Sequence, residues 1–438
     1  MASRFPRFRF PAGSRSRLVL GLSGCSGLGL YYFASTFRKI HADVNFNSQP
    51  QQGHRETYHL QPHVGVHRVD SVFWPSNYPS EDVLTSMYVR PMSWSFWSVY
   101  DGHVGPQTAW HLEKHLLPKL VESLHVLYSK GEKQPQTEAI HSAIKKVFIS
   151  LDDDMVNKSA QLISAQPEGT PIQALAARVL QVARAGSCAL VAFYDANVRT
   201  LHVSVVGDSR AVLGRRRKTA DGKTVYDVRV LSLDQTGRNP AEVARLSAEH
   251  PDEKLFDGAR FLGWGITRTF GNGSMKWSKE LQVWMEKNCM GNKPRTTLLT
   301  PPYFTARPEI TTTEIQPGDF MIMASDGMWD CLTNEEAVGL VGLWLEGKSN
   351  DKKLLADSEE RVIERTELPV EITDDKTHYS YWNVKKRFVN VDSNVARHLA
   401  RNALGGADKD LHAALLSLPA PRARYFRDDV SAVVVFFE

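Results

Sequence analysis

Cysteine is scarce in this sequence, and the few residues present lie far apart. The 438-residue chain has four cysteines, and no two of them form a CxxC pair. This spacing argues against a zinc ribbon and against a small disulfide-bonded scaffold, and it fits a protein of a reducing compartment. The four are Cys25, Cys188, Cys289 and Cys331.

A strong net charge is also missing. The formal net charge is +4, with 42% hydrophobic and 23% charged residues. This is the balance of an ordinary globular protein with enough apolar material for a large core. Because there is no basic stripe, the sequence predicts no nucleic-acid partner and disfavours a metal-dependent nuclease.

Acidic residues are absent from the start of the chain, where Asp43 is the first. Residues 1–17, "MASRFPRFRFPAGSRSR", contain five arginines. An acid-free start with arginine and serine is typical of a mitochondrial targeting segment. We therefore expect a mitochondrial protein, in the matrix or at the inner membrane.

Residues 18–37, "LVLGLSGCSGLGLYYFASTF", lack charge altogether. Their length is about that of a membrane-spanning helix, and glycines such as those here recur in membrane helices. Two interpretations stay open: an inner-membrane anchor, or the apolar part of a cleaved presequence. The polar residues 38–63 are predicted to be a linker, and residues 64–438 to be the folded domain.

The folded part alternates helical and strand patterns. Apolar residues at three- and four-residue spacing predict helices over 107–129 and 137–161. Thr333 and Glu336 stand at capping-box spacing, so another helix should begin there. Strands apolar on both faces are covered on both faces, which predicts packed sheets with helices outside. The expected strands lie within 187–217, 319–327 and 429–438, and a further helix over 394–404.

Carboxylates stand at the ends of several predicted strands. In "SFWSVYDGHV" (residues 95–104) an aromatic run ends at Asp101, and similar positions recur along the chain. One such aspartate is usually a turn or cap residue, but several together suggest a cluster at a sheet edge. The others are Glu81, Asp82, Asp208, Asp326 and Asp428.

Such a cluster would repel itself unless a cation compensated it. A set of oxygen ligands without cysteine or histidine suits Mg²⁺ or Mn²⁺ rather than zinc. His103, two residues after Asp101, could donate a proton to a leaving alkoxide. The alternative for His103 is a surface imidazole or one that only supports the cluster.

Five motifs together carry a family resemblance. Over about residues 64–438 the chain resembles the metal-dependent serine/threonine protein phosphatases of the PPM (2C) family. The resemblance implies an α+β fold, a central antiparallel β-sandwich with helices on both outer faces. The motifs, in order, are "VYDGHVG", "VVGDSRAVLG", "GITRTFGN", "ASDGMWD" and "RDDVSAVVVFF".

The resemblance also implies site roles. Two Mg²⁺ or Mn²⁺ ions, and in addition a third, weaker one, would activate a bridging water that attacks phosphoserine or phosphothreonine directly. Asp101 would bridge the two ions and serve in catalysis with His103. The other implied ligands are the Gly102 carbonyl, Asp326, Asp428, Asp82, Glu81 through water, and Asp208 for the third ion.

A narrower likeness rests on "SNYPSED", "LSLDQTGRNPAEVARLSAEHP", "KWSKELQ", "TPPYFTARPEIT" and the doubled aspartate in "YFRDDVSAVVVFF". These are similar to mitochondrial pyruvate dehydrogenase phosphatase catalytic subunits and their fungal relatives, which implies the pyruvate dehydrogenase complex as partner. Many family members carry a phosphate-gripping arginine where this chain has Asn77. Asn77 could bond the substrate phosphate without charge, and Arg68 and Arg90 are unranked candidates for the missing cation.

The sequence leaves two alternative functions open and predicts two insertions in the folded domain. The chain could be an inactive phosphatase-like scaffold, or a phosphatase of another mitochondrial phosphoprotein. Residues 348–393 are predicted to be an exposed insertion, and residues 273–302 a second one. In the latter, Trp277 and Trp284 are either contact anchors for a partner or side chains packed on their own domain.

Overall fold

A computed structural model describes residues 42–45, 54–129, 134–349 and 361–438 of the chain. One compact unit runs from Ala42 to Glu438. The predicted targeting segment and the uncharged segment at residues 18–37 lie outside the described residues. None of the helices within the described ranges has the length and apolarity needed to cross a membrane.

The first of two large sheets has the strand order β1-β4-β5-β7-β8-β14, and all its neighbours are antiparallel. Short strand β6 also pairs with β5 and with β13. The bounds are β1 Ala42–Asn45, β4 Asp82–Val89, β5 Trp94–His103, β6 Gly186–Ser187, β7 Ala189–Asp195, β8 Thr200–Val206, β13 Phe270–Gly271 and β14 Glu309–Glu314.

The second sheet has the order β10-β9-β15-β16-β3-β2 and is antiparallel as well. A separate small hairpin joins β11 to β12. The bounds are β2 Arg55–His63, β3 Val66–Trp74, β9 Arg210–Lys218, β10 Thr224–Val230, β11 Phe256–Asp257, β12 Arg260–Phe261, β15 Phe320–Ala324 and β16 Val430–Phe437.

Strand β16 shows why the sheets stack and why helices cover them. Its side chains alternate between two faces, as the period of a strand requires. Val433 and Val435 lie in a core cluster with Trp97 of the first sheet. Val434 and Phe436 lie in another cluster with residues of the covering helices. The run is apolar throughout because both faces are buried, in agreement with the sequence pattern.

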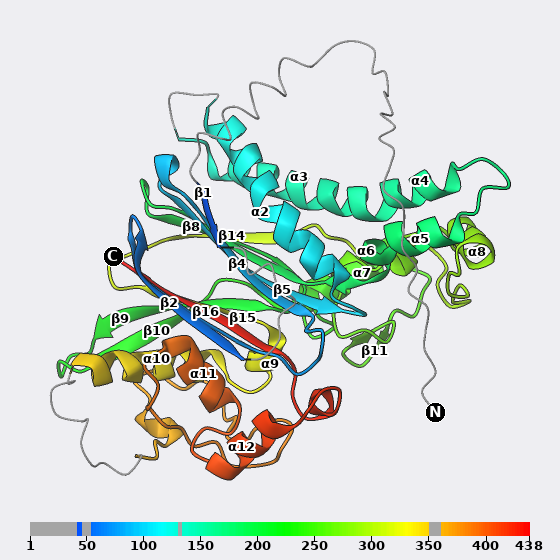
Figure 1. Ribbon diagram of the computed structural model, residues 1–438. Helices are drawn as coiled ribbons and strands as arrows, with labels where there is room; N and C mark the ends of the chain where they lie inside the picture. The colour runs from blue at the N-terminus through cyan, green and yellow to red at the C-terminus, as the bar shows by residue number, and fades with distance from the viewer. Residues whose placement is uncertain (1–41, 46–53, 130–133, 350–360) are drawn as a thin grey trace, which may run out of the picture. The chain divides into compact units, whose positions relative to one another are not determined.

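Helices cover both outer faces of this sandwich (Figure 1). Helix α2 contacts β4 and β5 and packs against α3, whereas α10 contacts β9 and β10, and α11 contacts β3 and β16. The predicted α+β sandwich flanked by helices is therefore confirmed. The helix bounds are α2 Gln107–Tyr128, α3 Thr137–Asp153, α4 Ser159–Ser164, α5 Gln173–Val179, α6 Gln181–Arg184, α7 Pro240–Glu249, α8 Lys279–Asn288, α9 Asp326–Trp329, α10 Asn334–Ser349, α11 Val395–Ala403 and α12 Lys409–Ser417.

Helix starts follow the local signals. Glu336 N donates to Thr333 Oγ1 at 3.1 Å, and Thr333 N donates to Glu336 Oε2 at 2.9 Å, which is the reciprocal pair predicted before α10. The helix expected over 137–161 is interrupted, because a π-helical turn at Asp154–Lys158 separates α3 from α4.

Two boundary expectations need correction. The predicted linker includes residues 55–63, but these form β2, which pairs with β3 along most of its length. Within residues 348–393 the described part is irregular, as expected, but it is not simply exposed. Tyr379 and Phe388 are buried against the α10 and α11 layer. One of its charges is buried too, since Lys386 Nζ lies 2.6 Å from Glu336 Oε2, but most of its other described charged side chains are exposed.

The predicted insertion at residues 273–302 contains α8. Trp277 is buried, and its indole N–H donates to Val156 O at 3.1 Å, while Trp284 is half-buried. Trp277 therefore packs on its own domain, and only Trp284 stays available as a contact residue.

Candidate metal centre

Three carboxylates from three separate elements converge at one end of the sandwich. Asp101, Asp208 and Asp326 each offer an oxygen, and these oxygens lie within 4.8 Å of one another. We call these three residues the acidic cluster. Asp101 belongs to β5, Asp208 lies where the chain leaves β8 of the first sheet for β9 of the second, and Asp326 follows β15. The cluster therefore forms only when both sheets are in place.

Among the described residues, no arginine or lysine forms an ion pair with these three carboxylates, and nearby arginines offset their pKa shifts only in part. Burial raises the pKa of Asp208 to about 8, and the Asp326 carboxylate adds to the increase. Burial and then Asp330 raise the pKa of Asp326 to about 6. Burial, followed by Asp82, raises the pKa of Asp101 well above its usual value. A divalent cation would remove this repulsion, and the all-oxygen donor set suits a hard ion.

Asp82 joins the cluster through strand register. It lies opposite Asp101 in the β4–β5 pair, and it is only 3% exposed. Its Oδ2 atom is buried and has no hydrogen-bond partner among the described residues. Burial and the Asp429 carboxylate raise the pKa of Asp82 well above its usual value. Since buried polar atoms normally have a partner, a carboxylate oxygen without a donor is well suited to bind a cation.

Gly102 allows the β4 edge to approach closely. Its N–H donates to Glu81 O at 3.1 Å. A Cβ at position 102 would lie 2.5 Å from that same oxygen, so a side chain would force the strands apart. Glu81 Oε1 accepts a hydrogen bond from Gly105 N at 2.6 Å. Burial raises the pKa of the Glu81 carboxyl group.

Asp428 lies beside the Asp326 turn, but its carboxylate is paired with an arginine. A Cβ on Gly327 would lie 3.1 Å from Asp428 Cβ, which places the two segments in contact. The Asp428 carboxylate forms an ion pair with Arg424 and accepts from Asp429 N at 2.7 Å. Among the predicted ligands, the structure thus brings Asp208 closest to Asp101 and Asp326, whereas Asp428 is paired with a cation.

His103 is held at the end of β5. Its Nε2 lies 2.6 Å from Asn272 Oδ1. A Cβ on Gly186 would lie 1.7 Å from that oxygen, so only glycine leaves room for the pair. Burial lowers the pKa of His103 to about 4, although the Asn272 bond acts in the opposite direction. This environment favours the neutral imidazole near pH 7.

The two candidate arginines for phosphate binding lie elsewhere. Arg68 Nη2 donates to Asp70 Oδ2 at 2.9 Å, and its guanidinium lies 4.9 Å from the Trp344 ring centroid under the α10 layer. Arg90 follows the far end of β4, roughly 25 Å along the strand from Asp82. Arg424, which sequence reasoning missed, is the cation beside Asp428; its only signal is the four-residue spacing in "RARYFRDD".

Asn77 lies in the loop that leads to Glu81 and Asp82. It is half-buried, its N–H lies 3.3 Å from Asp429 Oδ1, and its side chain interacts with Glu81. The amide is therefore near the cluster, as a phosphate contact would have to be.

A cavity of about 620 Å³ opens beside the acidic cluster. It is large enough for a phosphorylated side chain and its neighbours in a peptide. Its lining includes two carboxylates of the cluster and cations of the surrounding loops. Among the lining residues are Asp208, Asp326, Arg238, Arg260 and Lys376.

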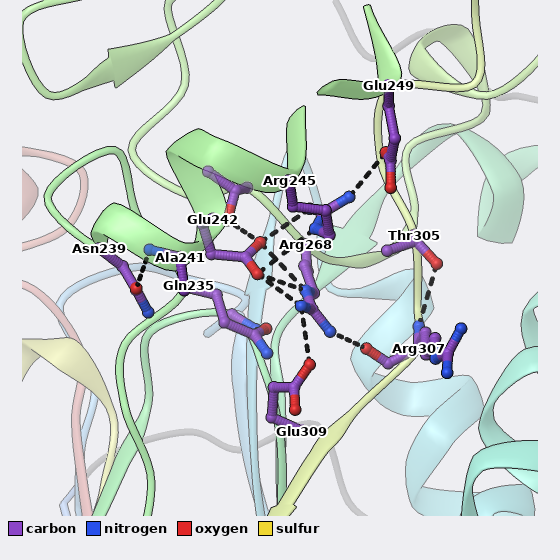
Figure 2. A network of polar contacts seen from close by, with 12 residues as sticks. Gln235, Asn239, Ala241, Glu242, Arg245, Glu249, Arg268, Thr305, Arg307 and Glu309 are labelled. Carbon is purple, nitrogen blue, oxygen red and sulfur yellow. Dashed lines mark hydrogen bonds and ion pairs between the residues drawn. The ribbon is translucent and has the colours of Figure 1, made fainter. Parts of the chain in front are cut away.

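An ion-pair network centred on the buried residues Glu242 and Arg268 anchors helix α7, which follows one part of the cavity wall (Figure 2). We call Glu242, Arg245, Arg268 and Glu309 the Glu242 network. Arg268 Nε lies 3.0 Å from both Glu242 carboxylate oxygens, and Arg268 Nη2 lies 2.9 Å from Glu309 Oε1. Burial alone would raise the pKa of Glu242, but bonds from Arg268 and Arg245 lower it to about 2. α7 is thereby fixed to β14 and the segment before β13.

Comparison with known proteins gives a consistent result. The protein phosphatase 2C family model matches residues 78–365. A protein phosphatase 2C homolog of Schizosaccharomyces pombe is 36% identical over 386 residues, which cover 85% of this chain and 81% of that protein. The mitochondrial [pyruvate dehydrogenase [acetyl-transferring]]-phosphatase 1 of Saccharomyces cerevisiae is 33% identical over 416 residues, 87% of this chain and 70% of that one.

More distant relatives include the human mitochondrial [pyruvate dehydrogenase [acetyl-transferring]]-phosphatase 2. It is 34% identical over 271 residues, which cover 59% of this chain and 49% of that protein. Among solved structures, a serine-threonine phosphatase 2C from Toxoplasma gondii covers 88% of this chain and 99% of its own at 16% identity, with a TM-score of 0.49.

Proposed function

This chain belongs to the protein phosphatase 2C family and is a serine/threonine protein phosphatase, and we propose that it acts in mitochondria on the pyruvate dehydrogenase complex. The observation that carries the catalytic part is the acidic cluster, three carboxylates with raised pKa values whose oxygens lie within 4.8 Å of one another beside a cavity. Carboxylates so arranged need a divalent cation to stay ionised together at neutral pH.

The residues present fit Mg²⁺ or Mn²⁺. We propose that Asp101 and Asp326 hold two ions with the help of Asp82, Asp428 and the Gly102 carbonyl, that Glu81 assists through water, and that Asp208 holds a third. When bound, such ions lower the pKa of water and neutralise a phosphoryl group. Support comes from the buried, donor-free Oδ2 of Asp82 and from the raised pKa values of the cluster.

The chain's own residues would position the substrate. The cavity beside Asp326 receives the phosphorylated side chain, and Asn77 contacts its phosphate from the loop before Glu81. In its protonated form, which an anionic phosphate beside the ring would favour, His103 would give a proton to the leaving serine or threonine oxygen and become neutral. Because its bond to Asn272 fixes the ring, the imidazole needs no reorientation before the transfer.

The proposed substrate and location are supported by the relatives and by the N-terminal sequence, not by the acidic cluster. Two of the relatives above carry mitochondrial pyruvate dehydrogenase phosphatase in their names. The arginine-rich, acid-free residues 1–17 are what import into mitochondria requires. A phosphatase of another mitochondrial phosphoprotein is the second candidate, since the fission-yeast relative's name specifies no substrate. An inactive scaffold is disfavoured because every expected carboxylate is present.

One experiment tests the proposal in two stages. Purified protein should release phosphate from a phosphoserine peptide with Mn²⁺ or Mg²⁺ and should stop when the metal is chelated. Cells lacking the protein should then show higher phosphorylation of the decarboxylase component of the pyruvate dehydrogenase complex. Activity in excess chelator would remove the metal mechanism. Unchanged phosphorylation in the deletion strain would leave the phosphatase and remove this substrate.

A further inference from the structure

The segment directly before β16 faces the loop directly after β3. Strands β16 and β3 are antiparallel neighbours, and Val430 lies opposite Trp74 in their register. Residues 427–429, the Arg-Asp-Asp segment, therefore leave the sheet beside residues 75–82, which we call the 75–82 loop. This loop ends in Glu81 and Asp82. Within the segment, the family resemblance implies a role for Asp428 alone.

Asp429 is a buried carboxylate whose two oxygens accept hydrogen bonds only from the 75–82 loop, as far as the described residues show. It is 3% exposed. Oδ1 serves the start of the loop and Oδ2 serves its end, so the two oxygens span the whole turn. The donors to Oδ1 are Ser76 N at 2.5 Å, Ser76 Oγ at 2.8 Å and Asn77 N at 3.3 Å; those to Oδ2 are Ser80 Oγ at 2.6 Å, Glu81 N at 3.1 Å and Asp82 N at 3.4 Å.

Arg427 binds the same loop through groups of the opposite polarity. Its side chain is 4% exposed, and its guanidinium donates to Pro75 O at 2.8 Å and Trp74 O at 3.3 Å. A third bond reaches Leu415 O at 3.1 Å. A cation on carbonyls and an anion on amides thus fix both sides of one loop, and charge-assisted bonds are the strong ones.

We propose that Arg427 and Asp429 are positioning residues that set the 75–82 loop against the acidic cluster and thereby define the metal affinity of the site. Asp428, between them, lies beside the Asp326 turn. Residues 427–429 therefore place both the Asp428 side chain and the 75–82 loop beside the acidic cluster. Glu81 and Asp82 end this loop, and from there they meet β5, where Asp82 lies opposite Asp101 and Glu81 O accepts from Gly102 N. The inference rests on the proposed metal-dependent function.

The rival explanation is that Asp429 only stabilises the fold. A matched control separates the two, because the same sheet holds a second buried aspartate at its opposite end. Asp319 is 1% exposed, accepts from Arg215 Nε at 2.9 Å and from Gln316 N at 2.9 Å, and lies before β15. Both aspartates stabilise the sheet, but only Asp429 touches the metal-site loop.

The test compares Asp429→Asn with Asp319→Asn in the full chain. An asparagine keeps the shape of Asp429 but must turn an NH₂ group towards one of the two donor sets. Mn²⁺ binding is followed by the electron paramagnetic resonance of the free ion, which needs no catalysis. We expect Asp429→Asn to bind Mn²⁺ roughly 10–100-fold more weakly, as loss of residues that orient ligands usually does. Asp319→Asn should bind Mn²⁺ as wild type does.

Activity gives a second measurement. In Asp429→Asn, the Mn²⁺ concentration for half-maximal activity should rise by the same factor, and saturating Mn²⁺ should restore most of kcat. Wild-type Mn²⁺ affinity in folded Asp429→Asn, or equal weakening in Asp319→Asn, would overturn the inference. Failure of the wild-type protein to bind Mn²⁺ would instead overturn the proposed function.

Ser80→Ala keeps the inference testable where Asp429→Asn does not fold. Ser80 Oγ donates to Asp429 Oδ2 at 2.6 Å and accepts from Asp82 N at 3.3 Å, so its loss removes two bonds of the same loop. We expect a several-fold weakening of Mn²⁺ binding. Unchanged affinity in this variant would count against the positioning role.

Discussion

Burial raises the pKa values of the acidic cluster and acts in the same direction on Glu242, but the neighbouring groups act on the two in opposite ways. Arg268 and Arg245 lie against Glu242, which holds the pKa of Glu242 at about 2. By contrast, burial and a neighbouring carboxylate raise the pKa of Asp208 to about 8. Glu242 is bonded directly by arginines and fixes structure, whereas the three cluster carboxylates form no ion pair among the described residues and are open to bind an ion.

The largest expected effect concerns the cluster. Asp326→Asn should lower phosphatase activity to that of the chelated protein, roughly a thousandfold, because a lost ligand displaces the ion that activates water. Stability of the metal-free protein should not fall, since the change removes repulsion between buried carboxylates. Steady-state kinetics and thermal unfolding check both points. An active Asp326→Asn would show that the cluster is not the catalytic site.

For Glu242 we expect the main effect on stability. Glu242→Gln should leave Arg268 buried without its main partner and destabilise the protein by about 3–5 kcal/mol, the usual result of breaking a buried pair. Denaturant unfolding measures this loss. The control is Glu249→Gln, which removes only the exposed end of the Arg245 contacts and should cost about 0–1 kcal/mol. An equal loss of unfolding free energy in Glu242→Gln and Glu249→Gln would show that the buried Glu242 pair contributes no more than an exposed one.

His103 stands between these extremes, since it is buried near the cluster but paired with a neutral amide. His103→Gln should slow phosphoserine hydrolysis by about 10²-fold, the lower end for a general acid, because burial already favours the neutral ring. An aryl phosphate has a better leaving group and should lose less. Equal losses on the two substrates would assign His103 a structural role.

The smallest effect is a pH dependence of stability from Glu242. Its folded pKa of about 2 lies below the ordinary 4.5, so its contribution is complete above about pH 4.5 and is lost as the pH falls towards 2. Unfolding followed between pH 5 and pH 2 should show a steeper decline in wild type than in Glu242→Gln. Parallel curves would mean that Glu242 titrates normally.

The part of the site that can be predicted from the sequence is the part with local signals. Asp101, Asp208 and Asp326 each follow an apolar strand, and the uninterrupted apolar run of β16 is enough to indicate two buried faces. Asp429 has no such signal, because its partners in the 75–82 loop lie about 350 positions earlier in the chain. In the sequence Asp428 and Asp429 look alike. Only the register of β16 with β3 shows that Asp429 contacts the 75–82 loop, whereas Asp428 lies beside the Asp326 turn.

Sequence-based expectations fail where distant partners decide. The sequence offers Arg68 as a phosphate ligand, but Asp70 and Trp344 hold it. Residues 348–393 are predicted to be exposed, and most described charges there are exposed, but Lys386 is buried against Glu336 of α10. Charge in a sequence indicates exposure only when no opposite charge is folded against it.

The position of β16 has a consequence for how the protein is made. This strand follows all the other described strands in the chain, yet it lies between β15 and β3 in the second sheet. During synthesis β3 emerges some 350 residues before its partner, and the pairing has a very long sequence separation. A nascent chain can therefore hold Asp82, Asp101, Asp208 and Asp326 and still lack the strand that joins β15 to β3 in the second sheet. The phosphatase should be inert on the ribosome and throughout any unfolded passage, and should become active in a single late step when residues 430–437 enter the sheet.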